Sequence, residues 1–557
     1  MVISLLAGLL AVAAGCGRDS TPHASAFAQE SANTAAAHAQ AVGVREAANA
    51  ARQGPPELPR DSVDTSMPSV AGRTLAVGPT GNLQAALNAA QPGDVITLAA
   101  GATYTGNFVL PRKTTTGWII IRPALPDAAL PAEGQRMTPV RAVSARLPRI
   151  VTPNSDAALA TAAGAHNYRI IGVEVTLGGR QRMTYALVAL GKSGDEGQTT
   201  AGSIPSHIVL DRMYIHGSST AKLRRCVALN SATSAVIDSH LSDCHDTPDD
   251  AQAIGGWNGP GPYRIVNNYL EGSGENIMFG GADPGIPNLV PSDIEIRRNH
   301  ITRPTSWKGV WKVKNLLELK NARRVLIEGN VFEHNWADGQ DGEAILLISM
   351  NQGGRAPWSA VQDINIRRNL IRYVGAGFLI STYTQNGPVE RAERISITDN
   401  LIYDIRATHE GTGRTFMLTG DVRDFQAKRN TIVEPTNSIL SMDGGTKPRL
   451  VVTDNLGGGG AYGIAGSGVI GARALAQHAP DGVFRGNVLA MPVRSDEMPP
   501  AGNWYPSSLT DIGFQNPARH DYRLAPSSRH RGVAAGGRNP GADMAAVLAA
   551  TKGVTQQ

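Results

Sequence analysis

One short pattern recurs along most of the chain: apolar, any, apolar, two polar, asparagine, any, apolar. Residues 294–301 read IEIRRNHI and residues 364–371 read INIRRNLI. The asparagine recurs at Asn268, Asn299, Asn330, Asn369, Asn400, Asn430, Asn455 and Asn487, and weaker copies without it centre on Val173, Met213 and Ser239. The copies lie about 31 residues apart, which is within the range of solenoid proteins.

A unit of this length cannot bury its apolar side chains alone, so it must stack on its neighbours. An asparagine at the same turn of every unit can hydrogen-bond to the asparagines before and after it, and asparagine tolerates the left-handed backbone of a tight bend. We therefore expect a structural column of asparagines in an all-β solenoid of about eleven coils. One solenoid can absorb all 557 residues without dividing into compact domains, because each coil packs only on its neighbours.

Both ends of the repeat region are typical of a solenoid that closes its core. Residues 83–90 place Leu83, Ala86, Leu87 and Ala90 on one helix face, and a turn at 91–94 and a strand at 95–98 follow. The segments that resemble the pectate-lyase-like superfamily are 82–94 and 106–108 at the start and 521–526 and 539–543 at the end. This resemblance covers about residues 73–545. It implies a right-handed parallel β-helix with a short N-terminal capping helix.

The first residues are typical of an exported protein. Residues 1–15 form an apolar run that ends in two alanines and a glycine before Cys16, which resembles a bacterial lipoprotein signal peptide. We expect residues 1–16 to be this signal and Cys16 to carry a lipid that attaches the protein to a membrane. An ordinary cleaved signal peptide is the alternative. The run is too short for a transmembrane helix, which needs roughly 20 apolar residues. The expected location is the cell envelope, as an outer-membrane lipoprotein, or the periplasm or exterior as a secreted protein.

Two flanking segments are expected to lie outside the solenoid. Residues 17–72 are rich in Ala, Gln, Ser and Pro and lack apolar periodicity, which predicts a disordered tether. Residues 546–557 are expected to be a C-terminal tail. Within the solenoid, Cys226 and Cys244 would form a disulfide in an oxidising compartment, and two buried thiols are the equally open alternative.

Positive charge and aromatic side chains concentrate in the middle of the chain. The net charge of +5 is too small to indicate nucleic acid and is compatible with an acidic polysaccharide. Four of the ten lysines, Lys308, Lys312, Lys314 and Lys320, lie within thirteen residues, and five of the seven tryptophans lie between 257 and 358. Aromatic faces stack on sugar rings, and clustered cations attract uronate carboxylates. The alternative is that the tryptophans fill wide turns and the lysines solubilise the surface.

Strand alternation predicts which side chains share a face. In residues 312–320 the charged residues have one parity and Val313, Leu317 and Leu319 have the other, which places the charges outside. Aligned by their apolar runs, the segments 252–258, 275–281, 314–320 and 343–349 stack as adjacent rungs. The resulting columns are Gln252, Glu275, Lys314 and Glu343, and, one strand step earlier, Asp250, Ser273, Lys312 and Asp341. Acidic residues thus flank the lysines.

Such a groove suits β-elimination on a uronate polymer. The reaction needs a group that neutralises the carboxylate, a base for the C5 proton and an acid for the leaving oxygen. We expect Lys320 or Lys314 as the base, because neighbouring cations favour a neutral lysine, and Arg323 or Arg324 to hold the carboxylate or assist the leaving group. The oxygen ligands expected for Ca²⁺ are Asp249, Asp250, Glu275, Asn276 and Glu318. The further substrate contacts expected are Lys312, Trp257, Trp311, Trp336 and Glu343.

The tripeptide Glu318-Leu319-Lys320 is similar to a strand of the chondroitinase-B and alginate-lyase group. This similarity implies that calcium bridges the uronate and that the lysine is the base. The Arg-His-Gly string of that group is absent downstream. The Gly-His-Gly and Arg-Ile-Lys strings of polygalacturonases and the Trp-Ile-Asp-His string of the commonest pectate lyases are also absent.

The sequence therefore predicts a polysaccharide lyase that acts on an acidic glycan as a monomer. A non-catalytic glycan-binding or adhesion protein with the same groove is the alternative from another class. A hydrolase that uses Asp249, Asp250 or Asp341, or a uronate epimerase, is the third hypothesis. The histidines at 240, 245, 300 and 334 lack helix-type metal spacing, which argues against a zinc site.

Overall fold

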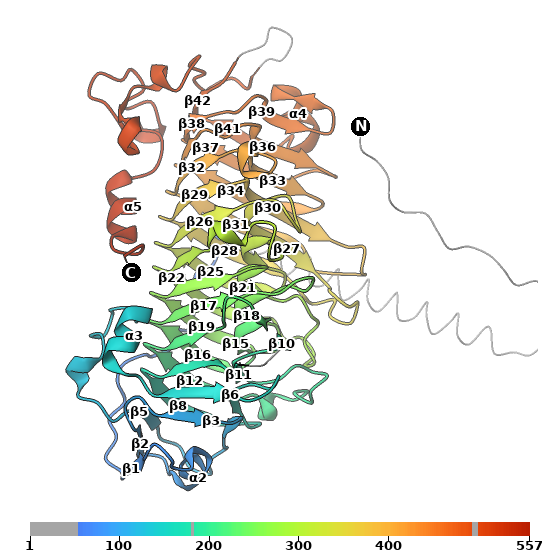
Figure 1. The fold of residues 1–557 in the computed structure, drawn as a ribbon. Coiled ribbons are helices and arrows are strands. Elements are labelled where there is room, and N and C mark those ends of the chain that lie inside the picture. The colour runs from blue at the N-terminus through green and yellow to red at the C-terminus, as the bar shows by residue number, and fades with distance from the viewer. Residues whose placement is uncertain (1–53, 180–182, 493–498, 557) are drawn as a thin grey trace, which may run out of the picture. The chain divides into compact units, whose positions relative to one another are not determined.

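Three long parallel β-sheets form the walls of a right-handed parallel β-helix (Figure 1). The computed structural model describes residues 54–179, 183–492 and 499–556. Each successive coil contributes one strand to each wall, so strands that are neighbours in a sheet come from consecutive coils and pair in parallel. The fold class predicted from the repeat is confirmed.

The first wall, sheet A, has fourteen strands within the described residues. They are β1 (Thr74–Val77), β2 (Val95–Leu98), β5 (Ile119–Pro123), β8 (His166–Ile171), β12 (Ser206–Asp211), β16 (Ala232–Ile237), β19 (Gly261–Val266), β22 (Ser292–Arg297), β25 (Ala322–Glu328), β28 (Val361–Arg367), β31 (Ala392–Thr398), β34 (Val422–Lys428), β37 (Val451–Thr453) and β41 (Val483–Arg485).

The second wall, sheet B, has thirteen strands in the same part of the chain. They are β3 (Thr103–Thr105), β6 (Arg149–Thr152), β9 (Glu174–Leu177), β13 (Tyr214–His216), β17 (His240–Cys244), β20 (Tyr269–Gly272), β23 (His300–Thr302), β26 (Val331–Asn335), β29 (Leu370–Val374), β32 (Leu401–Ile405), β35 (Thr431–Val433), β38 (Leu456–Gly458) and β42 (Val488–Ala490).

The third wall, sheet C, also has thirteen described strands, and its last strand pairs antiparallel. They are β4 (Phe108–Leu110), β7 (Leu159–Thr161), β11 (Val188–Leu190), β15 (Arg225–Leu229), β18 (Gln252–Gly256), β21 (Glu275–Phe279), β24 (Asn315–Leu319), β27 (Glu343–Met350), β30 (Ala376–Tyr383), β33 (Arg414–Thr419), β36 (Ser438–Asp443), β39 (Gly463–Gly466) and β40 (Val469–Ile470).

Short helices and two-stranded β-ribbons are attached to the three walls. The helices are α2 (Leu83–Ala89), α3 (Pro139–Ala145), α4 (Gly471–His478) and α5 (Met544–Thr551). The ribbons pair β10 (Met183–Thr184) with β14 (Lys222–Leu223), and β43 (Phe514–Asn516) with β44 (Asp521–Leu524). Helix α2 forms where the apolar face at 83–90 predicts it, and its Leu83 and Leu87 are buried in the main core.

The described solenoid has more coils than the eleven expected. The asparagine pattern is recognisable only from about Val173, whereas strands β1 to β7 already build the same three sheets before it. A count of coils that relies on the asparagine at the turn therefore omits the first coils.

The asparagine column is confirmed as a buried ladder. Asn330 Oδ1 accepts hydrogen bonds from the backbone nitrogen of Asn299 at 2.9 Å and from Asn299 Nδ2 at 3.0 Å. Asn330 Nδ2 in turn donates to the Ile296 carbonyl at 2.8 Å. The left-handed backbone at the bend belongs to the residue before the asparagine, such as Arg298 at φ 55° or Arg368 at φ 54°. This bend directs the N–H and the side chain of each asparagine toward the asparagine of the next coil.

The prediction of a disordered tether up to residue 72 is wrong for its last part. The backbone nitrogens of Glu57 and Arg60 donate to Asp363 and Asp293, both on sheet A, at 3.2 and 2.9 Å. Val63 is 2% exposed and packs on outward-facing apolar residues of the same sheet. The extended segment is ordered because sheet A supplies partners for its backbone and for Val63. Cys16 and the proposed signal peptide lie outside the described residues, so lipid attachment stays a prediction, and none of the described helices is long and apolar enough to cross a membrane.

The expected C-terminal tail is also part of the folded unit. Met544 and Val547 of α5 are buried against Leu401 and Tyr403 on the outer face of sheet B. In Figure 1 this segment runs back alongside the stack. The sequence did not reveal the docking because the alanine-rich helix has no distinct apolar stripe.

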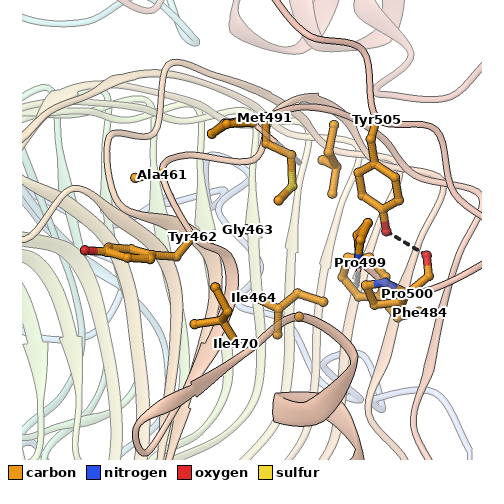
Figure 2. A pocket seen from close by; sticks show the side chains of 13 residues that line it. Ala461, Tyr462, Gly463, Ile464, Ile470, Phe484, Met491, Pro499, Pro500 and Tyr505 are labelled. Atoms are coloured by element: carbon orange, nitrogen blue, oxygen red, sulfur yellow. Dashed lines mark hydrogen bonds between the residues drawn. The ribbon is translucent and has the colours of Figure 1, made fainter. Parts of the chain in front are cut away.

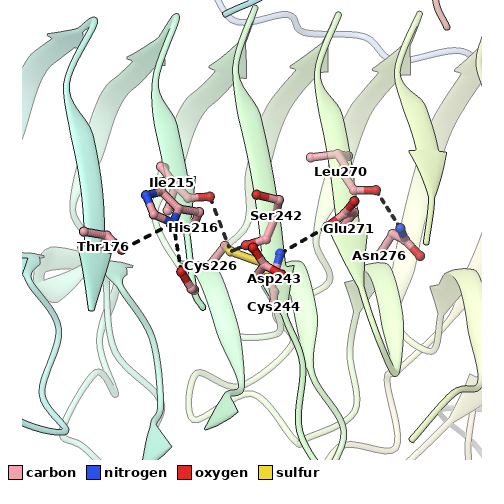
Figure 3. The surroundings of a disulfide bond; sticks show 11 residues. Thr176, Ile215, His216, Cys226, Ser242, Asp243, Cys244, Leu270, Glu271 and Asn276 are labelled. Carbon is pink, nitrogen blue, oxygen red and sulfur yellow. Dashed lines mark hydrogen bonds between the residues drawn. A yellow bond between two sulfur atoms is a disulfide. The ribbon is translucent and has the colours of Figure 1, made fainter. Parts of the chain in front are cut away.

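Cys226 and Cys244 form a disulfide with a Cα–Cα distance of 5.7 Å, which settles the alternative left open by the sequence. Figure 3 shows the bond between β15 of sheet C and β17 of sheet B. Both cysteines are fully buried. The bond therefore ties two walls of one coil together inside the core.

Candidate functional site

The outer face of sheet C is where the structure assembles the predicted site. Strands β18, β21, β24 and β27 are successive rungs, as the paired residues Ile254, Ile277, Leu317 and Ile345 show. The prediction that these four segments lie side by side is confirmed. The ordered segment at 57–66 and helix α5 lie on sheets A and B instead.

The expected register is wrong by one residue at β24. Glu275 lies beside Asn315 and not beside Lys314. Leu316 and Leu317 are both buried in the core, so inside and outside positions do not alternate at the start of this strand. Parity alone therefore misaligns the rung. Lys314 precedes the strand, and its side chain reaches toward earlier coils.

Lys314 links two carboxyl groups on those coils. Its Nζ lies 2.5 Å from Asp250 Oδ2 and 3.9 Å from Glu275 Oε1. Gln252 Nε2 donates a 2.7 Å hydrogen bond to Glu275 Oε2. Glu275 is fully buried, so a carboxyl group, an amide and an ammonium meet at the base of this face.

Charge is shared unequally in this cluster. Burial raises the pKa of Glu275 well above its usual range, and the nearby Glu318 carboxylate raises it further. Burial alone would lower the pKa of Lys314, but Glu275 and Asp250 outweigh burial and raise it. Lys314 therefore stays protonated, which suits an anion-binding group and not a base.

Lys320 and Glu318 form the second half of the cluster. Lys320 Nζ lies 2.9 Å from Glu318 Oε1, and the lysine side chain is 13% exposed while that of Glu318 is fully buried. Asn315 Nδ2 donates to Glu318 Oε2 at 3.0 Å and to Gln340 Oε1 at 2.7 Å. Lys320 therefore lies at the edge of the buried cluster. Its described ion pair is with Glu318, whereas Lys314 approaches both Asp250 and Glu275.

Several buried oxygen atoms in this cluster accept no hydrogen bond. They are Gln252 Oε1, Glu275 Oε1, Asn315 Oδ1 and Glu318 Oε1, the last of which faces Lys320 without hydrogen-bond alignment. Two carboxylates and two amides are the hard oxygen donors that Ca²⁺ prefers, so these residues fit the ion. No three His, Cys, Asp or Glu side chains converge as metal ligands in the described part of the chain, and the fit therefore depends on the amides.

The other predicted calcium ligands lie differently. Asp249 is exposed and lies 3.8 Å from Arg224. Asn276 donates to the carbonyls of Leu270 and Thr302 at 2.7 and 2.6 Å, so its side chain is turned away from Glu318. Asp250 is engaged by Lys314. Of the five, the structure brings Glu275 and Glu318 close together, and Glu318 is also paired with Lys320.

Arg303 is a buried cation beneath the cluster that the sequence did not reveal. Its guanidinium donates to Asn276 Oδ1 at 2.9 Å, to the Asn315 carbonyl at 2.6 Å and to Asn335 Oδ1 at 2.5 Å. Burial lowers the pKa of Arg303 to about 9. The three contacts tie β21, β24 and β26 together and fix the start of β24. An arginine at a strand end before a proline carries no sequence signal for this role.

Arg323 and Arg324 are not part of this cluster. Both lie on β25 of sheet A, and Arg324 makes two 2.7 Å hydrogen bonds to Asp293 of the same sheet. The charges that act on Arg323 are those of Asp363, Arg324, Glu390 and Arg394, and burial lowers its pKa. The structure thus separates both arginines from Lys314 and Lys320.

Two of the predicted tryptophans pack against protein groups. Trp336 is 5% exposed and forms an apolar cluster with Trp307 and Val313, with Trp311 at its edge. The His245 ring stacks on Trp311 at a centroid distance of 3.9 Å. This packing agrees with the interpretation that these tryptophans fill a wide turn. Lys312 lies in the same turn and is half-buried.

Trp257 and Glu343 flank the cluster on either side. The Arg225 guanidinium carbon lies 4.8 Å from the centroid of the Trp257 ring. Glu343, the first residue of β27, is 6% exposed, and burial raises its pKa to about 7. Glu343 is therefore a carboxyl group that can hold a proton near neutral pH.

A separate apolar pocket lies beyond the last coils (Figure 2). Its cavity volume is about 20 Å³, and Ile464, Phe484, Leu489 and Tyr505 are among the residues that line it. None of the described residues that line it is a lysine or carries a carboxyl group.

No protein-family model and no curated protein matches the chain. Among solved structures, it is similar to a mannuronic acid-specific polysaccharide family 6 lyase from the human gut microbiota, with 12% identity, a TM-score of 0.45, and 76% of this chain and 88% of that chain covered. It is also similar to the PL6 family alginate lyase AlyGC, with 14% identity, a TM-score of 0.46, and coverage of 82% and 57%. A family 28 exopolygalacturonase from Yersinia enterocolitica gives 11% identity, a TM-score of 0.37, and coverage of 77% and 80%. At these identities the likeness concerns the course of the backbone alone.

Proposed function

We propose that the outer face of sheet C cleaves an acidic, uronate-containing polysaccharide by β-elimination, with Lys320 as the base. One observation carries the proposal: Lys314, Lys320, Glu275 and Glu318 lie within one charged cluster on adjacent rungs. The cluster thereby places a cation that can bind a uronate carboxylate beside a lysine that can accept the C5 proton of the sugar.

The two lysines take different roles. Lys314 stays protonated and binds the substrate carboxylate, since Glu275 and Asp250 hold its charge in place. Lys320, in its neutral form, takes the C5 proton. The released electron pair forms the C4=C5 double bond as the C4–O bond breaks, and the departing oxygen takes up a proton from water. Glu318 then stabilises the protonated Lys320.

We propose Ca²⁺ as the cofactor, held by Glu275 and Glu318 with the amide oxygens of Gln252 and Asn315. When bound, the ion supplies positive charge that neutralises the uronate carboxylate and makes the C5 proton more acidic. Gln252, Glu275 and Asn315 each have a buried oxygen without a hydrogen-bond partner among the described residues, which supports this choice.

The test is a direct assay of the full chain on pectate, alginate and glycosaminoglycans, with and without a calcium chelator. Elimination creates an unsaturated uronate that absorbs in the ultraviolet. Lys320→Ala is expected to lower the rate about 10²–10⁴-fold, the usual contribution of a general base. Lys308→Ala is the matched control, because Lys308 is exposed and pairs with Glu410, and it should keep the activity.

Three results would overturn the proposal. New reducing ends without ultraviolet absorbance would indicate a hydrolase. A changed uronate composition without cleavage would indicate an epimerase. Binding without any product would indicate a glycan-binding or adhesion protein.

A further inference from the structure

Arg225 is a cationic feature of sheet C that the proposed reaction does not use. It is the first residue of β15, three rungs before β24. Its guanidinium makes no hydrogen bond or ion pair with any residue that the structure describes, and its Nε is buried. By contrast, the buried Arg169 and Arg394 each contact a carboxylate. The residue is half-buried, and Nε is the guanidinium nitrogen that is both buried and unpaired, so the terminal nitrogens are available to a partner from outside the chain.

The surroundings of Arg225 hold the guanidinium in one position. The Trp257 ring lies over it, with 4.8 Å between the guanidinium carbon and the ring centroid. A Cβ at Gly255 would come within 3.2 Å of Arg225 Nε, so the glycine leaves the space that the side chain occupies. The neighbouring Cys226 is fixed by its disulfide. The cation is therefore presented in advance and does not need to be ordered on binding.

Small residues line the outer face of sheet C on this side of the cluster. The outward residues at matching positions are Ala160, Ala189, Ala228 and Gly255 up to β18, and Met278, Glu318, Leu346 and Leu379 in the next four rungs. A hollow of about 380 Å³ continues the face toward the first coils, with Val109 and Lys192 among its lining residues. A polymer bound at Lys320 can therefore extend in this direction.

We propose that Arg225 and Trp257 form a binding subsite for a second carboxylate-bearing sugar of the same chain, on the N-terminal side of the reacting bond. The guanidinium binds the carboxylate through two parallel N–H donors, and the exposed part of Trp257 packs on the sugar ring. The guanidinium lies against β18, which is two rungs or about 10 Å from β24, so Arg225 contacts a different sugar unit from the one that loses its C5 proton. This subsite would serve the substrate of the proposed function. Only its part in the reaction rests on that function, because binding can be measured without cleavage.

The experiment compares the affinity of the full chain for uronate oligosaccharides by calorimetry, in a Lys320→Ala background that prevents cleavage. Arg225→Gln is expected to weaken binding about 10- to 100-fold, which corresponds to the loss of one charge-assisted interaction. Arg225→Lys keeps the charge but loses the paired donors, and it should give an intermediate affinity. Arg297→Gln is the matched control, because Arg297 is 43% exposed on sheet A, and it should leave the affinity unchanged.

A carboxyl-reduced, neutral form of the same oligosaccharide separates charge recognition from general contact. Arg225→Gln should not weaken its binding further. On an active background, Arg225→Gln should raise KM for long uronate chains and leave kcat unchanged. Unchanged affinity for the uronate ligand, an equal loss with the neutral ligand, or a loss confined to kcat would each overturn the subsite. Binding through Arg225 without an unsaturated product would leave the subsite standing and refute the proposed reaction.

Discussion

Glu343 offers a quantitative test of the electrostatics of this wall. The carboxyl group is 6% exposed, and its pKa is raised to about 7 from an ordinary value of 4.5, chiefly by burial. The folded protein therefore binds a proton more tightly than the unfolded chain between pH 4.5 and pH 7. Its stability must fall as the pH rises through this window, because ionisation is penalised only in the folded state.

Glu343→Gln removes the ionisation and retains the shape of the side chain. The shift of about 2.5 pKa units corresponds to about 3 kcal/mol, so at pH 8 the variant should be more stable than the natural protein by up to this amount. At pH 4 the difference should nearly vanish. Because solenoid coils open locally, the measurement is amide hydrogen exchange of β27, which should slow on the order of 100-fold at pH 8.

The comparison at two pH values distinguishes the ionisation penalty of Glu343 from a change in local packing. An amide at position 343 would change local contacts equally at both pH values, whereas the ionisation penalty acts only at the higher one. Glu133→Gln on the exposed surface is the control and should change nothing. Equal exchange rates at pH 8, or the same difference at pH 4 and pH 8, would refute the reasoning.

Two predictions concern the scaffold. Asn330→Ala removes the acceptor of two hydrogen bonds from Asn299 and leaves buried groups unpaired, so it should lower the free energy of unfolding by about 3–5 kcal/mol. Thermal unfolding measures this, with Asn386→Ala at an exposed position as the control. Equal unfolding midpoints for the two variants would show that the ladder is dispensable. Replacing both Cys226 and Cys244 with serine opens a bond between residues 18 apart and should cost about 3 kcal/mol; a denaturant midpoint that does not change between the double variant and the natural protein would contradict this.

The sequence by itself determined the architecture. The spacing of Asn299, Asn330 and Asn369 is a short-range property, and each coil needs only its neighbours to bury its apolar residues. The helix at 83–89 and the adjacency of the four rungs from β18 to β27 could be predicted for the same reason. Lys314, Lys320, Glu275 and Glu318 were found together because strand alignment by apolar runs is accurate to about one residue.

Only the tertiary structure decided the details that set the chemistry. Leu316 and Leu317 both face inward, so the true partner of Glu275 is Asn315, which parity cannot reveal. Arg303 and Arg225 gain their significance from groups on other coils, and nothing in their local sequence marks them. The ordered segments at 57–66 and 544–551 dock through partners that are hundreds of residues away in the chain. Local periodicity fixes which residues form a coil, but the environment of a buried charge depends on which coils meet and on how the turns between them fold.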